Sequence, residues 1–337
     1  MAIKAFTIIS ENYLPQAKTL ADNFIQLHPD IEFYICLFGE NTNDEFHKIK
    51  SDLFSGYNYI LSNELNQGDY AVMRNQYDNF SMACALKPYF AELILEKDKP
   101  NGLIYLDADL YFFTPLTDVQ TLLNNKEQRS SIILTPHNVS IKEFNQEIER
   151  NISFLTYGTF NAGFFAIKNN QYSKQFIDWW KRMLNEHCIV DLQNGLYCDQ
   201  TWLNLVPTLF TNSLHILKHL GYNAAYWNID AERKISINPQ NKYIVNNKDF
   251  LVFYHFARFR YFDTENIIPN VNFSQVLNGN IIQDLYIQYR ELLKINSFET
   301  FQRDIDTIQE SKVEKESKII QLKNKIKWKI IRIIQKM

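Results

Sequence analysis

The chain has 337 residues, of which 46% are hydrophobic and 15% aromatic, with nine Gly and nine Pro. This composition excludes low-complexity and largely disordered proteins, and the length allows one large α/β domain with an extension, or two ordinary domains. The cysteines Cys36, Cys84, Cys188 and Cys198 form no CxxC pair, which favours reduced thiols in a cytoplasmic protein over a zinc site or a disulfide framework. We expect no signal peptide and no membrane span, because the apolar runs are too short.

The net charge of −3 is unevenly distributed along the chain. Residues 315–337 contain eight Lys or Arg and one acid, a balance of +7, so the residues before them carry −10. An acidic body with a basic tail indicates that the tail, rather than the body, meets a polyanionic surface.

The tail also has helical apolar spacing, with a tryptophan among its lysines. The residues concerned are Ile319, Leu322, Ile326, Trp328, Ile330, Ile333 and Ile334. Such a helix is typical of a peripheral anchor on anionic lipid, which predicts a protein on the inner face of the cell membrane. The same spacing suits a short coiled coil that makes a homodimer, and both interpretations stay open. We expect no nucleic acid partner, because the acidic body would repel it.

The first third of the chain alternates strands and helices. Apolar spacing predicts strands over 3–10, 32–39 and 102–112, and helices over 13–29 and 78–96, the second with a kink or junction at Pro88. This βαβ-like alternation predicts a largely parallel sheet covered by helices, with ligands beyond the carboxyl ends of the strands.

The rest of the chain continues this pattern and then becomes helical. We expect strands over 130–137, 159–168, 221–229 and 250–259, a connection over 138–158, a helix over 171–187, and a loop that opens a short helix over 197–207. The pattern is mainly helical from about residue 278. We therefore predict a catalytic-sized domain over 1–275 and a helical extension over 276–337 that ends in the basic tail.

Two acids, Asp107 and Asp109, lie one residue apart at the end of an apolar run. An unpaired carboxylate in an apolar interior costs several kcal/mol, and no Lys or Arg lies within several residues of the pair. Two carboxylates at this spacing suit a hard divalent cation such as Mn²⁺ or Mg²⁺ and leave positions for water and phosphate. The alternative is that one acid caps the next loop while the other pairs with a distant base.

The segment "ALKPYFAELILEKDKPNGLIYLDADLYFFTPL" (85–116) resembles glycosyltransferases of the GT-A fold, closest to glycosyltransferase family 8 and its bacterial relatives. Three more segments follow in the order of that family: "FNAGFFAI" (160–167), "CDQTWLN" (198–204) and "VFYHFARF" (252–259). The similarity runs from residue 1 to about 260. It implies an α/β, GT-A nucleotide-sugar transferase domain.

The resemblance implies a metal site made by Asp107, Asp109 and His255. The cation, Mn²⁺ or Mg²⁺, would bridge the diphosphate of a nucleotide-sugar donor, with a UDP-sugar expected. The glycine and lysine that usually follow this histidine are replaced by "ARFR", so Arg258 or Arg260 could contact phosphate instead. The alternative for His255 is a neutral histidine in an aromatic core.

The resemblance also implies residues that bind the donor. They are Thr7, Ser10, Asn12 and Tyr13 for the nucleotide, Lys87 and Arg258 near the diphosphate, and Ala108, Asn161, Ala162 and Gly163 beside the metal and the donor sugar. Each group also has a purely structural explanation. Polar residues fill many loops, and Lys87 would suit the surface. A tight turn at the start of a strand would also select Asn161 and Gly163.

The expected catalytic residues are Asp199 and Gln200, which resemble the acid and amide under the donor sugar near the reacting carbon. Asp199 would alternatively cap the short helix after it, and the two roles are compatible. Tyr222, Tyr226 and Trp227 suit either an aromatic platform for a sugar or base, or ordinary core.

These observations predict a metal-dependent glycosyltransferase, hexosyltransferase-like, that moves a sugar to a glycan or lipid-linked acceptor in bacterial surface polysaccharide synthesis. The resemblance implies retention of anomeric configuration. A sugar nucleotidyltransferase would want a Gly-rich basic loop after the first strand, which "SENYLPQA" lacks. A non-catalytic, membrane-associated glycan-binding protein on a transferase scaffold remains the alternative from another class, and Asp107, Asp109, Asp199 and His255 argue against it.

Overall fold

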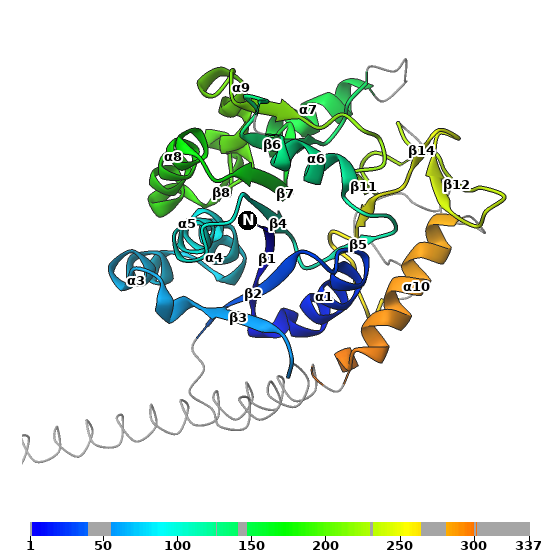
Figure 1. Cartoon of the computed structure of the whole chain (residues 1–337), viewed down its shortest axis with the longest axis horizontal. Helices are drawn as coiled ribbons and strands as arrows, with labels where there is room; N and C mark the ends of the chain where they lie inside the picture. The colour runs from blue at the N-terminus through cyan, green and yellow to red at the C-terminus, as the bar shows by residue number, and fades with distance from the viewer. Residues whose placement is uncertain are drawn as a thin grey trace, which may run out of the picture.

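The computed structural model describes residues 2–39, 55–125, 127–140, 147–229, 232–263, 281–299 and 301. In this part of the chain, helices cover both faces of a central sheet with strand order β10-β6-β7-β4-β1-β2-β3 (Figure 1). The strands are β1 (Ile3–Ser10), β2 (Glu32–Phe38), β3 (Asn58–Leu61), β4 (Gly102–Leu106), β6 (Ile132–Pro136), β7 (Phe160–Lys168) and β10 (Leu214–Ile216). Near-continuous apolar runs such as β4 and β7 are buried along their whole length, as strands covered on both faces must be.

Pairing in the sheet is mostly parallel. β1 pairs in parallel with β2 and β4, β2 with β3, and β10 with β6, whereas β7 is antiparallel to both β4 and β6. This confirms the predicted α/β class with a parallel-rich sheet. Because β7 runs the other way, its amino end meets the carboxyl ends of β1, β4 and β6 at one edge of the sheet.

Two hydrophobic cores lie on opposite faces of the sheet. One contains residues of α3, α4, α5 and α8, including the fully buried Trp180, and the other contains residues of α1 and α6. These helices are α1 (Leu14–Leu27), α3 (Gln67–Gln76), α4 (Asn79–Ala85), α5 (Lys87–Lys97), α6 (Thr117–Asn124) and α8 (Gln171–His187). The apolar spacing of α8 is that of a helix with one buried face, and the Asn170 side chain caps its first amides.

The predicted long helix over 78–96 is two helices with a junction. α4 ends at Ala85, Leu86 joins it to α5, and Pro88 lies in the first turn of α5. Proline suits this position because the first turn leaves its amides without intrahelical partners. The junction makes Lys87 the first residue of α5.

The predicted strand over 102–112 is two strands that belong to different sheets. β4 ends at Leu106, and β5 (Leu110–Phe112) pairs with β15 (Phe253–His255), which in turn pairs with β11 (Ala224–Ala225). The chain leaves the main sheet at the two acids because carboxylates cannot follow β4 into the apolar core. In this register His255 lies opposite Leu110, one residue from Asp109.

The structure corrects the predicted connection over 138–158. Residues 147–157 form α7 (Glu147–Tyr157), although its apolar residues Ile148, Ile152 and Leu155 are exposed. Contact at one end of the helix explains its position, since the ring of Phe154 stacks on His137 with centroids 5.5 Å apart.

Short helices, short strands and one long helix make up the remaining described elements. They are η1 (Glu11–Tyr13), η2 (Ser62–Glu64), β8 (Val190–Asp191), η3 (Leu192–Asn194), β9 (Leu196–Tyr197), η4 (Thr201–Leu205), α9 (Val206–Leu209), β12 (Ile235–Ile237), β13 (Tyr243–Val245), β14 (Asp249–Phe250) and α10 (Ile281–Ile295). The late strands are therefore shorter than the predicted 221–229 and 250–259.

α10 begins the predicted helical extension and packs on the body of the protein. Its buried residues, such as Tyr286 and Tyr289, share a third apolar cluster with Tyr254 and Phe256. The predicted boundary between 275 and 276 and the tail 315–337 lie outside the described residues, so the division into two parts stays a prediction. No helix in the described part of the chain combines the length and apolar character that a bilayer span needs.

Candidate active site

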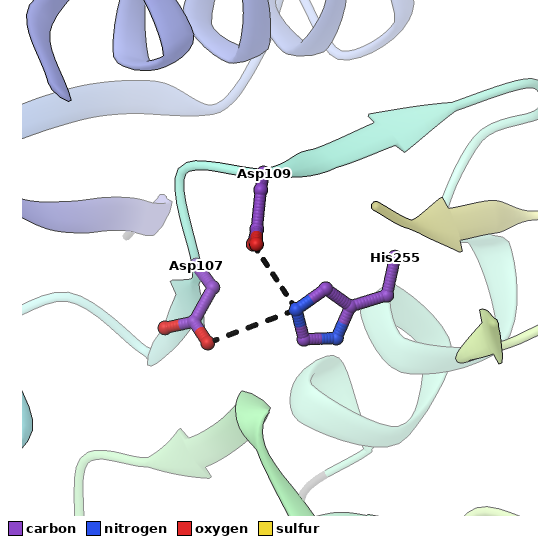
Figure 2. Close-up of side chains that lie close together, drawn as sticks. All are labelled: Asp107, Asp109 and His255. Carbon is purple, nitrogen blue, oxygen red and sulfur yellow. Dashed lines mark ion pairs between the residues drawn. The ribbon is translucent and has the colours of Figure 1, made fainter. Parts of the chain in front are cut away.

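The two acids and the histidine predicted as metal ligands meet at the edge of the sheet where the carboxyl end of β4 lies beside the amino end of β7 (Figure 2). His255 Nε2 lies 3.0 Å from Asp109 Oδ1 and 4.0 Å from Asp107 Oδ2. One ligand atom from each residue lies within 4.8 Å of the other two. The structure thus brings together Asp107, Asp109 and His255, and their role as metal ligands stays a prediction.

These three residues fit a divalent cation. The carboxylates are partly exposed and His255 is buried beneath them. A Cβ atom on Gly163 would lie 2.7 Å from Asp107 Oδ2 and 2.6 Å from His255 Cε1, so only a glycine leaves the carboxylate and the ring where they are. Two carboxylates and one imidazole nitrogen form a donor set that suits Mn²⁺ or Mg²⁺.

Backbone hydrogen bonds hold both acids in place. The Asp107 amide donates to the Gly163 carbonyl oxygen at 2.8 Å, and the Asp109 carbonyl oxygen accepts from the Phe256 amide at 2.9 Å. Burial disfavours a charged His255, but the carboxylate of Asp109 and then that of Asp107 outweigh it and raise the pKa of the imidazole.

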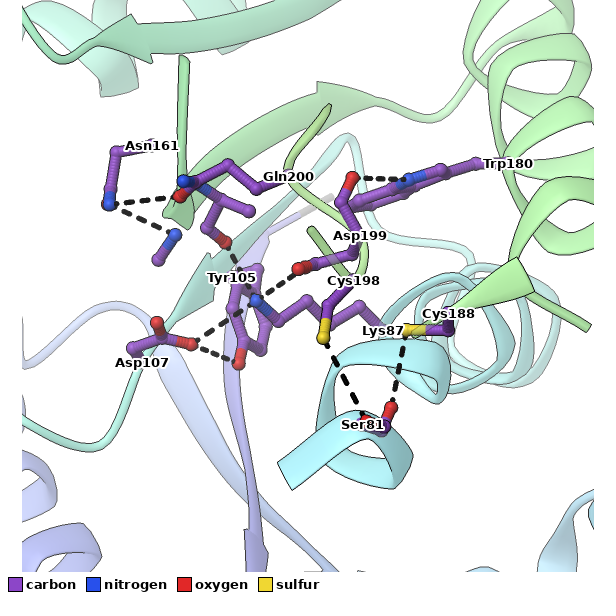
Figure 3. Close-up of polar contacts among 12 residues, drawn as sticks. Ser81, Lys87, Tyr105, Asp107, Asn161, Trp180, Cys188, Cys198, Asp199 and Gln200 are labelled. Atoms are coloured by element: carbon purple, nitrogen blue, oxygen red, sulfur yellow. Dashed lines mark hydrogen bonds and ion pairs between the residues drawn. The ribbon is translucent and has the colours of Figure 1, made fainter. Parts of the chain in front are cut away.

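Lys87 is a buried cation beside the proposed metal site (Figure 3). Its Nζ lies 2.8 Å from Asp199 Oδ2 and 3.4 Å from Asp107 Oδ1, and it donates to the Ala162 carbonyl oxygen at 3.0 Å. Burial opposes its charge, but Asp107 and Asp199 raise the pKa of the Lys87 ammonium well above its ordinary value. Lys87 is therefore not a surface lysine. It is the cation that pairs with Asp107 and Asp199, neither of which has a basic partner in its own segment.

Asp199 is buried and directs its carboxylate at Lys87, so it is not the cap of the short helix after it. Burial raises the pKa of Asp199, and the Lys87 ammonium opposes that rise. Tyr105, which the sequence interpretation missed, lies under the same group. Its hydroxyl donates to Asp107 Oδ1 at 2.5 Å, and Lys87 Nζ lies 4.7 Å from the centre of its ring.

Asn161 and Gln200 form a network of amides next to Lys87 (Figure 3). Gln200 Oε1 accepts from the Ala162 amide at 3.2 Å and from Asn161 Nδ2 at 3.4 Å, while its Nε2 donates to the Tyr157 carbonyl oxygen at 2.7 Å. Asn161 Oδ1 accepts from the Gly163 amide at 3.1 Å. The two amides are thus oriented by the backbone of β7 and α7.

An irregularity in β7 brings these groups together. Asn161 pairs with Thr135 and Phe165 with Leu134, so the residues 162–164 have no counterpart on β6. This bulge points the Ala162 carbonyl at Lys87 and the Gly163 carbonyl at Asp107. Bulges often redirect side chains or backbone at active sites.

The residues predicted to hold the nucleotide lie at the end of β1. Thr7 is fully buried within the strand, whereas Ser10 ends it and Asn12 and Tyr13 follow in η1. Although Tyr13 is 51% exposed, partial desolvation of its hydroxyl, and then the charges of Asp109 and Asp107, raise the pKa of its phenol. Tyr13 thus lies within electrostatic range of Asp109 and Asp107. The roles of Thr7, Ser10, Asn12 and Tyr13 stay predictions.

The remaining predicted residues divide between core and site. Ala108 is buried between the two acids, and Tyr222 belongs to the core. Trp227 lies edge-on to His255 and His137, with centroids 5.3 Å apart in each case. Arg258 makes no ion pair with Asp107, Asp109 or Asp199, and the pKa of its guanidinium is raised, first by Tyr226.

Three cysteines that are distant in sequence gather behind Asp199. Cys188 Sγ contacts the Ser81 carbonyl oxygen at 3.3 Å, and Cys198 Sγ lies 3.9 Å from Ser81 Oγ. Hydrogen bonds from Cys188 and then Cys84 lower the pKa of Cys198 to about 4. All three are buried free thiols.

We predict that Gly163→Ala lowers the affinity for Mn²⁺ at least tenfold. The added methyl group would displace Asp107 and His255, and disturbed ligands typically cost about 10- to 100-fold in metal affinity. Isothermal titration with Mn²⁺ measures the change. Gly68→Ala is the matched control, because the nearest atom to its Cβ is Asn66 Oδ1 at 3.2 Å. Unchanged Mn²⁺ affinity in Gly163→Ala would contradict the site.

We also predict strong coupling between Lys87 and Asp199 in a double-mutant cycle. Lys87→Met leaves Asp199 buried without its cation and should lower the free energy of unfolding by about 3–5 kcal/mol. Adding Asp199→Leu should recover about 1–3 kcal/mol of this loss. Urea unfolding measures both. The more exposed pair Lys181 and Glu92 provides the control cycle, where we expect less than about 1 kcal/mol; additive effects at Lys87 and Asp199 would refute the prediction.

Sequence comparison relates this chain to known proteins. The sequence model of Glycosyl transferase family 8 matches residues 5–245. YfnF of Bacillus subtilis (strain 168), described as uncharacterized, is 24% identical over 255 residues, which are 75% of this chain and 80% of YfnF. YfnD of the same organism, also described as uncharacterized, is 28% identical over 181 residues, 52% of each chain.

Two glycosyltransferases of solved structure match the chain at low sequence identity. The galactosyltransferase LgtC, in complex with donor and acceptor sugar analogs, superimposes with a TM-score of 0.49 and 14% identity over 86% of this chain and 95% of LgtC. The glycosyltransferase GlyE of Streptococcus pneumoniae gives 0.41 and 17% over 66% of this chain and 46% of that one. Because the family model matches well over half of its residues, the chain belongs to glycosyl transferase family 8 and is a glycosyltransferase.

Proposed function

We propose that this glycosyltransferase moves a sugar from a UDP-sugar to a glycan or lipid-linked acceptor in bacterial surface polysaccharide synthesis. We also propose that it needs Mn²⁺ or Mg²⁺ and retains the anomeric configuration, as the family resemblance implies. One observation carries the metal-dependent part of the proposal: Asp107, Asp109 and His255 converge within 4.8 Å at the edge of the sheet where ligands of α/β proteins bind.

The proposed cation would be held by Asp107, Asp109 and His255. When bound, it would neutralise charge on the leaving nucleoside diphosphate, a contribution worth several kcal/mol. Tyr105 and Gly163 support this role, because the Tyr105 hydroxyl orients the Asp107 carboxylate and Gly163 leaves room for it.

The donor sugar is proposed to lie over the amides of Asn161 and Gln200. Each amide offers a donor and an acceptor to sugar hydroxyls, and their orientation is set before any ligand binds. The carbonyl oxygen of Gln200 is suited to stabilise positive charge that develops at the anomeric carbon. Asp199 acts on this region through Lys87, whose ammonium it holds at 2.8 Å.

The end of β1 is the proposed place of the nucleotide. Ser10, Asn12 and Tyr13 supply hydroxyl and amide groups on the side of Asp109. The buried Thr7 lies within β1, before Ser10, so it would contribute by fixing the position of this segment.

Binding of UDP provides the direct test. Wild-type protein should bind UDP tightly with Mn²⁺ and at least tenfold more weakly after chelation of the metal, because a cation held by Asp107, Asp109 and His255 would neutralise charge on the diphosphate. Asp109→Ala should remove this difference, while Asp178→Ala, on the exposed face of α8, should keep it. Isothermal titration measures each affinity. Equal UDP binding with and without Mn²⁺ would refute the metal-dependent site. In a separate experiment, hydrolysis of a panel of UDP-sugars would identify the donor.

The basic tail is proposed to bring the enzyme to anionic lipid, where a lipid-linked acceptor would be found. Deletion of residues 315–337 should abolish sedimentation with vesicles that contain anionic lipid and leave UDP binding unchanged. Vesicles of zwitterionic lipid are the control. Unchanged sedimentation, or loss of a dimer on deletion instead, would favour the coiled coil.

A further inference from the structure

His137 directly follows β6 and is buried among aromatic rings. Its ring stacks on Phe154 of α7 with centroids 5.5 Å apart, and the ring of Trp227 lies edge-on to it at 5.3 Å. Its amide donates to the Thr159 carbonyl oxygen at 2.9 Å, and its carbonyl oxygen accepts from Asn228 Nδ2 at 3.1 Å. Packing and hydrogen bonds of the backbone thus hold the imidazole in place, and no part of the proposed function uses it.

The imidazole of His137 meets the amides of the proposed sugar site. His137 Nε2 lies 3.4 Å from Asn161 Nδ2, and the same Nδ2 lies 3.4 Å from Gln200 Oε1. Either nitrogen of the first contact could in principle carry the proton that they share. The backbone groups at the ends of this network decide which one does.

Backbone amides fix the orientation of both side-chain amides. The Gly163 amide can only donate, so the atom that it meets at 3.1 Å is the Asn161 oxygen, and the Asn161 nitrogen faces His137. The Ala162 amide likewise donates to Gln200 Oε1 at 3.2 Å, which makes that oxygen an acceptor. Asn161 therefore directs N–H groups at both His137 and Gln200.

This arrangement requires a lone pair on His137 Nε2. A neutral imidazole with its proton on Nδ1 offers that lone pair, whereas a proton on Nε2 would point two N–H groups at each other. Nδ1 is buried without a hydrogen-bond partner in the described part of the chain, so the contact at Nε2 decides between the tautomers. Burial lowers the pKa of His137 to about 3, which keeps the ring neutral at neutral pH.

We infer that His137 is a positioning residue of the proposed sugar site: its Nε2 accepts from Asn161 and thereby holds the amides of Asn161 and Gln200 in the orientation that meets the donor sugar. This inference rests on the proposed function. His137 contacts neither the sugar nor the metal in this assignment, so loss of its acceptor should slow turnover without weakening UDP binding.

Nitrogen NMR of the full-length protein tests the tautomer without any ligand. Spectra of protein with labelled imidazoles distinguish a protonated from an unprotonated ring nitrogen, and His137→Gln identifies the signals of His137. We expect a proton on Nδ1 and none on Nε2 at neutral pH. His28 is the internal reference, because its Nδ1 lies 3.0 Å from the Phe24 carbonyl oxygen and its Nε2 accepts from the Leu116 amide at 2.8 Å, which fixes the same tautomer.

Two substitutions separate the hydrogen bond of His137 from its packing. His137→Phe keeps an aromatic ring between Phe154 and Trp227 but removes the acceptor, whereas His137→Gln places an amide oxygen near the position of Nε2. With Mn²⁺, His137→Phe should lower kcat for UDP-sugar hydrolysis about tenfold or more, because misplaced contacts to the substrate slow the reaction. His137→Gln should recover most of this loss.

The probe for hydrolysis is whichever of UDP-glucose, UDP-galactose and UDP-N-acetylglucosamine wild type hydrolyses fastest. Isothermal titration with UDP and Mn²⁺ should give the wild-type affinity for both His137 variants. His187→Phe is the matched control, since it makes the same replacement at an exposed histidine, and it should leave kcat and UDP affinity unchanged.

Four results would overturn the inference: a proton on His137 Nε2, a wild-type kcat in His137→Phe, an equal loss of kcat in His137→Gln and His137→Phe, or a loss of UDP affinity in His137→Phe. The third would mean that only the ring packing matters. Failure of wild type to bind UDP with Mn²⁺, or to hydrolyse any of the three sugars, would instead count against the proposed function, and the NMR spectra would still decide the tautomer.

Discussion

Compensation of negative charge at one edge of the sheet is the constraint on which the rest of the site depends. Asp107, Asp109 and Asp199 converge there, and carboxylates so close together cannot all stay ionised without cations. Lys87 supplies one cation to two of them from a fully buried position. His255 Nε2 lies 3.0 Å from Oδ1 of the third, Asp109. The proposed metal ion would add the remaining positive charge on the side open to ligands.

Several features of the fold serve this arrangement. The break between α4 and α5 makes Lys87 a helix start, so its side chain leaves the helix toward the sheet edge. The bulge in β7 turns the Ala162 carbonyl toward that ammonium, which would otherwise lack a third acceptor. Departure of the chain from the main sheet after β4 places Asp109 next to β15 and thus next to His255.

Much of this organisation could be predicted from the sequence. Long apolar runs identified the strands of the main sheet, and helical spacing identified α1 and α8 nearly to the residue. Asp107 and Asp109 stood out because an apolar run rarely carries unpaired acids. The link from these acids to His255 came from resemblance to a family, since no spacing rule connects residues so distant in the chain.

The features that escaped prediction depend on tertiary contacts. Lys87 and Asp199 pair across the sheet edge, and neither segment carries a local sign of the other. Tyr105 looked like one more aromatic residue of a buried strand, although its hydroxyl bonds to Asp107. α7 was expected to be a connection. Its apolar residues Ile148, Ile152 and Leu155 are exposed in the structure, so burial of an apolar face, the usual basis for predicting a helix, does not account for it.

The backbone bonds at Asp107 and Asp109 bear on how such an enzyme can diverge. Each acid is held by a peptide group, of Gly163 or of Phe256, so most side-chain replacements nearby leave its position untouched. Asn161 and Gln200 are held through side-chain hydrogen bonds, which a replacement of either residue changes directly. Selection for new sugars can therefore act on the specificity of this scaffold while the carboxylates that would hold its metal stay fixed.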